Sequence, residues 1–186
     1  MIGGRKGECD VAQVGFVLGG CKSGKSGYAQ NRVLDAGEPD KVFVATCSPQ
    51  DEEMRLRVER HRRERGPEWR TVEAPRELAE TIRRHAGKDS ALLVDCLGMW
   101  VANLLGRNLE EPKCHEHFDS LVEALKEVEG PVWLVSNEVG CGIVPQSAMS
   151  RSFRDLLGVL NQRVAGIADS VVWMVAGLPL GIKGSS

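Results

Sequence analysis

Five short runs of the 186-residue chain are apolar at both odd and even positions. A strand with one face in water would alternate apolar and polar residues. Unbroken apolar runs therefore predict strands that are covered on both faces. The five runs are VGFVLG (14–19), KVFVAT (41–46), ALLVD (91–95), PVWLVS (131–136) and SVVWMV (170–175).

Longer segments with helical periodicity separate these runs, near residues 25–36, 51–65, 75–86, 97–106, 115–129 and 151–168. No Asn-Gly or Asp-Gly pair joins neighbouring strands as a hairpin turn, which favours crossover connections and parallel pairing. We therefore predict an α/β fold with a mainly parallel sheet flanked by helices, in one domain over residues 14–183. Residues 1–13 are rich in glycine and charge and are expected to form a flexible tail.

Composition narrows the choice of partners. The formal net charge of −2 gives no general attraction to nucleic acid or to an anionic membrane, so neither is expected as a partner. No segment approaches the roughly 20 apolar residues that span a bilayer. The first residues lack the apolar core of a signal peptide, and a cytoplasmic location is therefore expected.

The six cysteines, at positions 9, 21, 47, 96, 114 and 141, form no C-x-x-C pair and are expected to be free thiols. The run Cys114-His115-Glu116-His117 has two interpretations, a structural zinc site or the polar start of a helix. No second cluster of ligands accompanies it, which favours the helix start.

A phosphate-binding loop is predicted at Gly19-x-x-x-x-Gly24-Lys25-Ser26, between a predicted strand and a predicted helix. Its glycines let backbone N–H groups turn toward phosphate oxygens, and the helix N-terminus adds positive potential. We expect Lys25 to reach the β- and γ-phosphates and the Ser26 hydroxyl to ligate Mg²⁺. Asp95 is the expected partner carboxylate, and capping of the next helix is compatible with that role.

A basic helical segment follows the second predicted strand. Helical spacing places His61 on one face with Met54, Val58 and Arg65, and further arginines stand at positions 62 and 63. In one interpretation His61 packs passively and the arginines form a solvated face. In the other, His61 attacks a nucleotide phosphate, because neighbouring cations keep an imidazole neutral and stabilise the developing phosphoryl charge.

Five stretches, covering about residues 14 to 183, together resemble one family. They are GGCKSGKS, ATCSPQDEEMRLRVERHRRERGPEWRTVEAP, LLVDCLGMWVANLL, VSNEVGCGIVP and FRDLLGVLNQRVAGIADSVVWMVAGLPLGIK. The distinctive parts are R-V-x-x-H-R-x-x-R before W-R-T-x-E, and N-E-V-G-x-G-I-V-P. The family that they resemble is the bifunctional adenosylcobinamide kinase/adenosylcobinamide-phosphate guanylyltransferase of cobalamin biosynthesis, which implies a P-loop, RecA-like fold.

The resemblance implies two reactions. In the first, the γ-phosphoryl group of ATP or GTP passes to the aminopropanol hydroxyl of adenosylcobinamide. In the second, a histidine attacks the α-phosphorus of GTP, and the GMP–histidine intermediate passes GMP to adenosylcobinamide phosphate. His61 matches that histidine, and Lys25 is the second residue expected to act in catalysis.

The resemblance also implies the guanine-nucleotide contacts. They carry over to Gly19, Gly20, Cys21, Lys22, Ser23, Gly24, Lys25, Ser26, Ala45, Thr46, Cys47, Arg62, Arg63, Glu64, Arg65, Glu73 and Asp95. Cys47 stands where the family commonly has serine. A thiol is a weaker hydrogen-bond partner than a hydroxyl, so only a backbone contact is expected to survive there.

Other features leave alternatives open. The loop Asn137–Gly142 follows a predicted strand and is either a simple turn or part of the site, with Glu138 the residue to test. The apolar stripe of the last helix predicts core packing, and the resemblance implies a homotrimer. Two rival functions remain, a P-loop small-molecule kinase without guanylyltransferase activity and a nucleotide-dependent switch protein.

Overall fold

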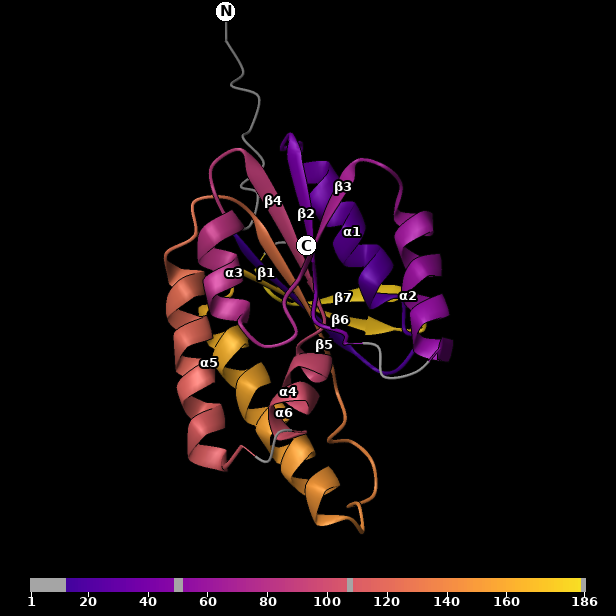
Figure 1. Ribbon diagram of the computed structural model, residues 1–186, viewed down its shortest axis with the longest axis vertical. Helices are drawn as coiled ribbons and strands as arrows, with labels where there is room; N and C mark the ends of the chain where they lie inside the picture. The colour runs from indigo at the N-terminus through magenta and orange to yellow at the C-terminus, as the bar shows by residue number, and fades with distance from the viewer. Residues whose placement is uncertain (1–12, 49–51, 107–108, 185–186) are drawn as a thin grey trace, which may run out of the picture.

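The protein forms one seven-stranded sheet with helices on both faces (Figure 1). The computed structural model describes residues 13–48, 52–106 and 109–184, and leaves out the side chains of Met54, Arg57, His61 and Glu64. The strand order is β3-β2-β4-β5-β1-β6-β7, and every neighbouring pair is parallel except β6 and β7. The predicted α/β class and mainly parallel sheet are therefore confirmed.

The elements follow one another in an alternating order. They are β1 (Val14–Gly19), α1 (Lys25–Ala36), β2 (Asp40–Ala45), α2 (Glu52–Arg65), β3 (Trp69–Glu73), α3 (Leu78–His85), β4 (Ser90–Asp95), α4 (Leu97–Leu105), α5 (Glu111–Lys126), β5 (Val132–Asn137), α6 (Ala148–Ile167), β6 (Ser170–Val175) and β7 (Leu178–Lys183). All five predicted strands and all six predicted helices are present, with shifted ends.

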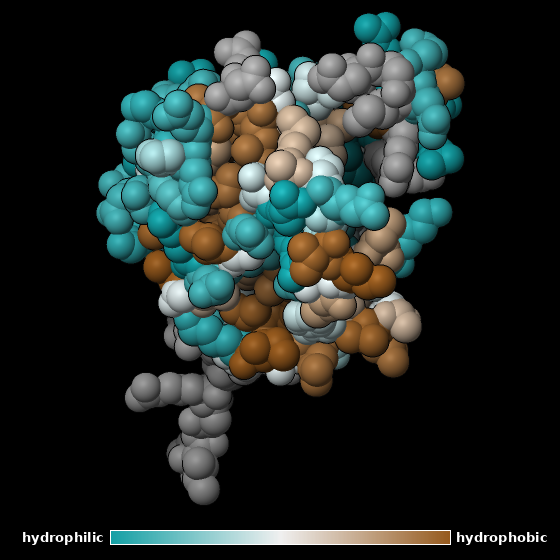
Figure 2. Space-filling view, turned by 90° about the horizontal axis from the view of Figure 1, so that it is seen from below, coloured by the Kyte–Doolittle hydropathy of each residue, from teal (hydrophilic) through white to brown (hydrophobic). Residues whose placement is uncertain are grey.

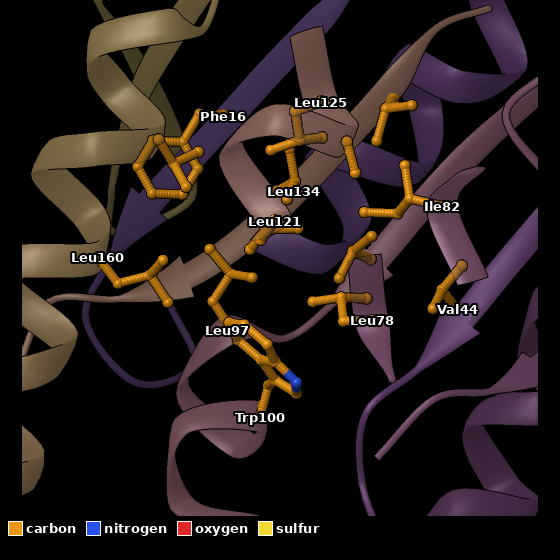
Figure 3. Packing of buried hydrophobic residues seen from close by; sticks show 14 of the residues in the cluster. Phe16, Val44, Leu78, Ile82, Leu97, Trp100, Leu121, Leu125, Leu134 and Leu160 are labelled. Carbon is orange, nitrogen blue, oxygen red and sulfur yellow. The ribbon is translucent and has the colours of Figure 1, made fainter. Parts of the chain in front are cut away.

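The two faces of the sheet carry cores of different size. The larger cluster packs α3, α4, α5 and α6 against one face, and Figure 3 shows side chains such as Leu97, Leu121 and Leu134 meeting there. The smaller cluster lies under α1 and includes Val17, Phe43 and Trp133. The predicted stripe of the last helix is confirmed as core, because Leu156, Leu157, Leu160 and Val164 are buried.

The pattern of apolar runs missed both edge strands. In β3 only Trp69 is buried, since an edge strand needs little apolar covering. All six residues of β7 are exposed. The β6–β7 connection is an antiparallel hairpin that the search for Asn-Gly and Asp-Gly pairs did not detect. Its turn uses Ala176 and Gly177 at φ 51° and 86°, which supply the positive φ values usually met by Asn-Gly.

The segment around Cys114 belongs to α5. This helix begins at Glu111, four residues before the predicted start, because Pro112 fits its first turn. Cys114 is buried in the core, and no group of three or more His, Cys, Asp or Glu side chains in the described residues is arranged to hold a metal ion. None of the five described cysteines forms a disulfide.

Gln13, the first residue that the structure describes, is bonded to the segment before β5 and to the start of that strand. Its side-chain amide donates to the carbonyl of Val128, and its own carbonyl accepts from the Val132 N–H at 2.7 Å. Residues 1–12 of the expected tail lie outside the described residues. None of the helices in the described part of the chain is long and apolar enough to span a membrane.

Candidate nucleotide site

The phosphate loop joins β1 to α1 at the carboxyl edge of the sheet, the lower edge in Figure 1. Gly24 is the residue before the helix and has φ 95°, a value that glycine adopts without strain. At Gly19 a Cβ would lie 2.5 Å from the carbonyl oxygen of Met174, so only glycine allows β6 to approach this closely. The predicted strand–loop–helix context of the loop is confirmed.

Lys25 is folded back into the loop. Only 7% of the residue is exposed, and its Nζ donates to the Gly20 carbonyl and, at 3.4 Å, to the Ser23 hydroxyl. Burial lowers the pKa of Lys25, and the negative charge of Asp95 opposes that effect. The ammonium group is thus already placed among the loop's own oxygens, where phosphate oxygens can replace them.

The turn of the β6–β7 hairpin contacts the phosphate loop. The N–H of Gly177 donates to the Ser23 carbonyl at 3.1 Å, and Ser23 is itself buried. Cys21 and Lys22 are exposed, and Lys22 has φ 53° in a turn of the loop. The loop is therefore fixed at its base and open at its tip.

Three predicted site residues form a row across the sheet edge. Ala45 pairs with Glu73 on one side and with Asp95 on the other. Asp95 interacts electrostatically with Lys25 and with Arg65, and raises the pKa of each against the lowering effect of burial. The charge of Asp95 therefore acts on both the Lys25 ammonium and the Arg65 guanidinium.

Thr46 connects the ends of β2 and β4. Its hydroxyl donates to the Cys96 carbonyl at 2.8 Å and accepts from the Cys96 N–H at 2.8 Å. The Asn103 amide in turn donates to the carbonyls of Thr46 at 2.7 Å and Pro75 at 3.0 Å. Because its hydroxyl is used in this way, Thr46 holds the segment after Asp95 in place.

Arg65 is the last residue of α2 and reaches back over the sheet. Its guanidinium lies 3.5 Å from the centroid of the Phe43 ring and donates to the Thr71 hydroxyl at 3.3 Å. Burial lowers the pKa of Arg65, with Asp95 acting in the opposite direction. This guanidinium therefore anchors the end of α2 to β2 and β3.

Most of the other described side chains of α2 are exposed to solvent. Among its described side chains only Val58 and Arg65 are half-buried, and Arg62 and Arg63 are exposed. This confirms the predicted face of the helix at positions 58 and 65. His61 lies on the helix between them, three residues after Val58 and four before Arg65, and its side chain and that of Glu64 lie outside the described part of the structure.

Sequence reasoning missed the residues that hold the site together. Asn103 had a signal, since it is the one polar side chain in the helix LGMWVANLL. Phe43 and Thr71 had none, because a core aromatic and an edge-strand threonine are ordinary at their positions. The loop after β5 lies beside the phosphate loop, as its N–H at Glu138 donates to the Gly19 carbonyl at 3.2 Å.

These features define a phosphate-loop nucleotide-binding protein. The fold is similar to that of the ATPase EscN from the type III secretion system of enteropathogenic E. coli, with a TM-score of 0.57 at 15% identity over 90% of this chain and 44% of that one. It is also similar to the flagellar accessory protein FlaH of Methanocaldococcus jannaschii, with a TM-score of 0.51 at 10% identity over 93% of this chain and 79% of that one. The expected P-loop, RecA-like fold is confirmed.

Sequence comparison then gives the family. Residues 15–182 match the family described as cobinamide kinase / cobinamide phosphate guanyltransferase, and the chain belongs to this family. It is 40% identical over 170 residues to the bifunctional adenosylcobalamin biosynthesis protein CobP of Pseudomonas aeruginosa, covering 91% of this chain and 96% of that protein. It is 37% identical over 180 residues to the CobU protein of the same description from Salmonella typhimurium, covering 90% and 98%.

Proposed function

We propose that this enzyme carries out both reactions for which its family is named, at one nucleotide site, within a single catalytic domain over residues 14–183. The observation that supports a shared site best is the position of Asp95, which interacts with Lys25 of the phosphate loop and with Arg65 of the basic helix. We infer that Lys25 and the basic helix act on one bound triphosphate.

In the kinase reaction the hydroxyl oxygen of adenosylcobinamide attacks the γ-phosphorus of ATP or GTP. The bond from that phosphorus to the bridging oxygen breaks, the nucleoside diphosphate leaves, and the hydroxyl proton passes to a base. Lys25 stabilises the charge that builds up on the phosphoryl oxygens, since its ammonium is held in a desolvated position.

In the guanylyltransferase reaction a nitrogen of His61 attacks the α-phosphorus of GTP, and pyrophosphate leaves. A phosphate oxygen of adenosylcobinamide phosphate then attacks the same phosphorus, the P–N bond breaks, and His61 is regenerated. Splitting the transfer into two displacements lets one nucleotide site serve both halves. The exposed guanidiniums of Arg62 and Arg63 stabilise the oxygens of the GMP group.

A magnesium ion fits the donor groups at this site. The Ser26 hydroxyl and the Asp95 carboxylate are hard oxygen ligands of the kind that Mg²⁺ prefers, and they would hold it. When bound, the ion supplies positive charge to the phosphate oxygens.

The remaining nucleotide contacts are proposed at the loop residues Gly19–Ser26, at Ala45, Thr46 and Cys47, at Arg62–Arg65 and at Glu73. For Thr46 the backbone is the better candidate, because its hydroxyl is already bonded to Cys96 on both sides. Glu73 is exposed at the end of β3, where a carboxylate suits the N–H donors of a guanine base.

Covalent labelling tests the function directly. Purified protein is incubated with Mg²⁺ and α-labelled GTP and is then denatured, and we expect a label that is acid-labile and stable in alkali. His61→Ala should lose the label completely, because no other group replaces the nucleophile. The phosphorylation of adenosylcobinamide should fall much less in the same variant.

His85→Ala is the matched control, since His85 ends α3 and lies outside the nucleotide site. It should keep both the label and the kinase activity. A folded wild-type protein that phosphorylates its acceptor without retaining guanylate would be a simple kinase. GTP hydrolysis that responds only to a partner protein would indicate a switch.

We also propose that the chain assembles into a homotrimer. The edge strand β7 supports self-association, because Leu178, Leu180 and Ile182 are 71%, 57% and 59% exposed and its outer backbone groups face no further strand of the described sheet. Light scattering coupled to size exclusion should give three times the chain mass of 20.3 kDa. A monomer at micromolar concentration would contradict this assembly.

A further inference from the structure

A cavity of about 280 Å³ lies between the loop after β5 and the side of α6. Its lining includes Glu138 and Gly140 from the loop, and Arg154, Asp155, Gly158 and Gln162 from the helix. None of the nucleotide contacts proposed above belongs to this lining. The cavity is therefore a separate feature of the carboxyl edge of the sheet.

The cavity is directly connected to the phosphate loop. β5 and β1 are neighbours, and Gly19 pairs with Asn137, the residue before Glu138. The Glu138 N–H donates to the Gly19 carbonyl at 3.2 Å. A group bound in the cavity would thus lie next to the loop that holds the phosphates, on the side of β1 that faces β5. Helix α2 and β3 lie beyond β4, on the far side of β5.

Buried hydrogen bonds fix the walls of the cavity. Asn161 on α6 is only 7% exposed. Its side-chain carbonyl accepts from the Ser136 hydroxyl at 2.7 Å, and its amide donates to the Asn137 carbonyl at 3.2 Å. These bonds tie the helix to the end of β5, so the cavity exists before a ligand binds.

Gly158 keeps the cavity open. It lies inside α6, where glycine costs about 1 kcal/mol relative to alanine, and a Cβ built there would meet no atom within 4 Å. The packing of the helix therefore does not require glycine at this position. A side chain at position 158 would extend into the cavity.

The charges of the lining select against a phosphate. Two carboxylates, Glu138 and Asp155, face a single guanidinium, Arg154, so the fixed charge around the cavity is negative overall. A polyanion such as the triphosphate is disfavoured there. Carboxylate, amide and guanidinium groups instead bond well to hydroxyl and amide groups of a ligand without negative charge.

The segment that joins the two walls of the cavity exposes apolar side chains. Ile143 and Val144, in the loop after β5, are 98% and 60% exposed, and Met149, in the first turn of α6, is 59% exposed. Figure 2 views the molecule from this end, and apolar surface is visible there among polar side chains. A polar pocket together with these apolar side chains suits a ligand that has a polar arm and a large, mostly apolar body.

We propose that this cavity binds the hydroxyl-ended, amide-bearing arm of the corrinoid acceptor, with the macrocycle resting on Ile143, Val144 and Met149. The proposal rests on the function proposed above, and adds the place of the second substrate. The cavity is too small for the whole corrinoid, so the arm alone enters. Its hydroxyl then approaches the γ-phosphate from the β5 side of the phosphate loop, and His61 approaches from the side of α2.

The variant Gly158→Leu fills the cavity and tests the proposal. We expect the KM for cobinamide to rise about tenfold or more, with the KM for ATP and the covalent label from α-labelled GTP unchanged within about twofold. Gly166→Leu is the matched control. Gly166 is an exposed glycine of the same helix, its Cβ would also meet nothing within 4 Å, and it lies outside the cavity. It should leave all three quantities unchanged.

Asp155→Asn provides a second variant that keeps the shape of the lining. Removing this one charged hydrogen-bond partner should raise the KM for cobinamide about threefold to tenfold. An unchanged KM for cobinamide in both Gly158→Leu and Asp155→Asn would overturn the proposal. Loss of the GMP label in Gly158→Leu, with the fold intact by circular dichroism, would overturn it too, because the cavity would then belong to the nucleotide.

Equilibrium dialysis separates this proposal from the function on which it rests. Wild-type protein without nucleotide should bind cobinamide more tightly than a corrinoid that lacks the hydroxyl-ended arm, and Gly158→Leu should bind the two equally. That result supports the cavity even if the wild type forms no GMP label and the guanylyltransferase function fails. Equal binding of both corrinoids by the wild type would overturn the cavity proposal alone.

Discussion

The phosphate loop and helix α2 both carry positive charge, but they are held in the structure in different ways. Lys25 is buried and bonded to two oxygens of its own loop, and the loop rests on Gly177 of the β6–β7 hairpin. In α2 the described side chains are exposed except for Val58 and Arg65. The Arg65 guanidinium stacks on the Phe43 ring and donates to the Thr71 hydroxyl. One region is fully formed before the nucleotide arrives, and in the other most of the described side chains are exposed.

This difference suits the roles that we propose for the two regions. A cradle for phosphates works best when its donors are fixed, because no reorganisation is then needed as charge develops. A nucleophile on a covalent path has to meet first GTP and then the phosphorylated acceptor. A helix whose described side chains are mostly exposed can adjust between those partners.

The largest effect is expected from the fixed region. Lys25→Ala should lower both the kinase rate and the rate of GMP labelling by about 10²- to 10³-fold, because a single preorganised donor serves both reactions. Both rates are measured on one preparation. Lys88→Ala removes an exposed lysine from the opposite edge of the sheet and serves as control. If only one of the reactions fell, the loop would not be shared.

A more selective effect is expected from the attachment point of α2. Arg65→Ala should slow GMP labelling about tenfold and the kinase reaction less, and should lower the free energy of unfolding by about 1–2 kcal/mol through loss of the stacking on Phe43. Hydrogen exchange without nucleotide should show faster exchange of the α2 amides. Arg55→Ala, an exposed arginine of the same helix, should change none of these. Unchanged α2 exchange in Arg65→Ala would mean that the anchor lies elsewhere.

An effect on stability alone is expected from the thiol of Cys96, beside the phosphate loop. Burial, with the charge of Asp95 adding to it, raises the pKa of Cys96 to about 11 from 9.0. The unfolded chain therefore loses this proton first, and the thiol's contribution to stability is present below pH 9 and disappears as the pH rises to 11. The loss is at most about 2.7 kcal/mol. Urea unfolding at pH 8 and pH 10.5 should show a smaller decline for Cys96→Ala than for the wild type.

The same thiol can be followed by ultraviolet absorbance. The difference in thiolate absorbance between the wild type and Cys96→Ala reports on Cys96 alone. This difference should reach half of its maximum near pH 11. A midpoint near pH 9 would mean that the pocket beside Lys25 is open to water in solution, and the contrast between the fixed loop and α2 would weaken.

Most of the fold could be predicted from the sequence because its central strands are covered on both faces. Five apolar runs marked the central strands, while β3 and β7 escaped because edge strands carry exposed and charged residues. The hairpin turn at Ala176-Gly177 escaped because its first residue is an alanine at positive φ. The phosphate loop was predicted in full, since glycine spacing encodes a backbone shape within a few residues.

The sequence by itself determined a strand–loop–helix that binds phosphates and a basic helix that carries His61. Only the tertiary structure decided that the charge of Asp95 acts on both Lys25 and Arg65, that Thr46 bonds to Cys96, and that Gly158 lines a cavity near Gly19. The physical reason is the distance along the chain over which a sequence pattern carries information. Local patterns record burial and backbone conformation over a few residues. Contacts between residues far apart in the chain depend on the order of strands in the sheet, which no single stretch encodes.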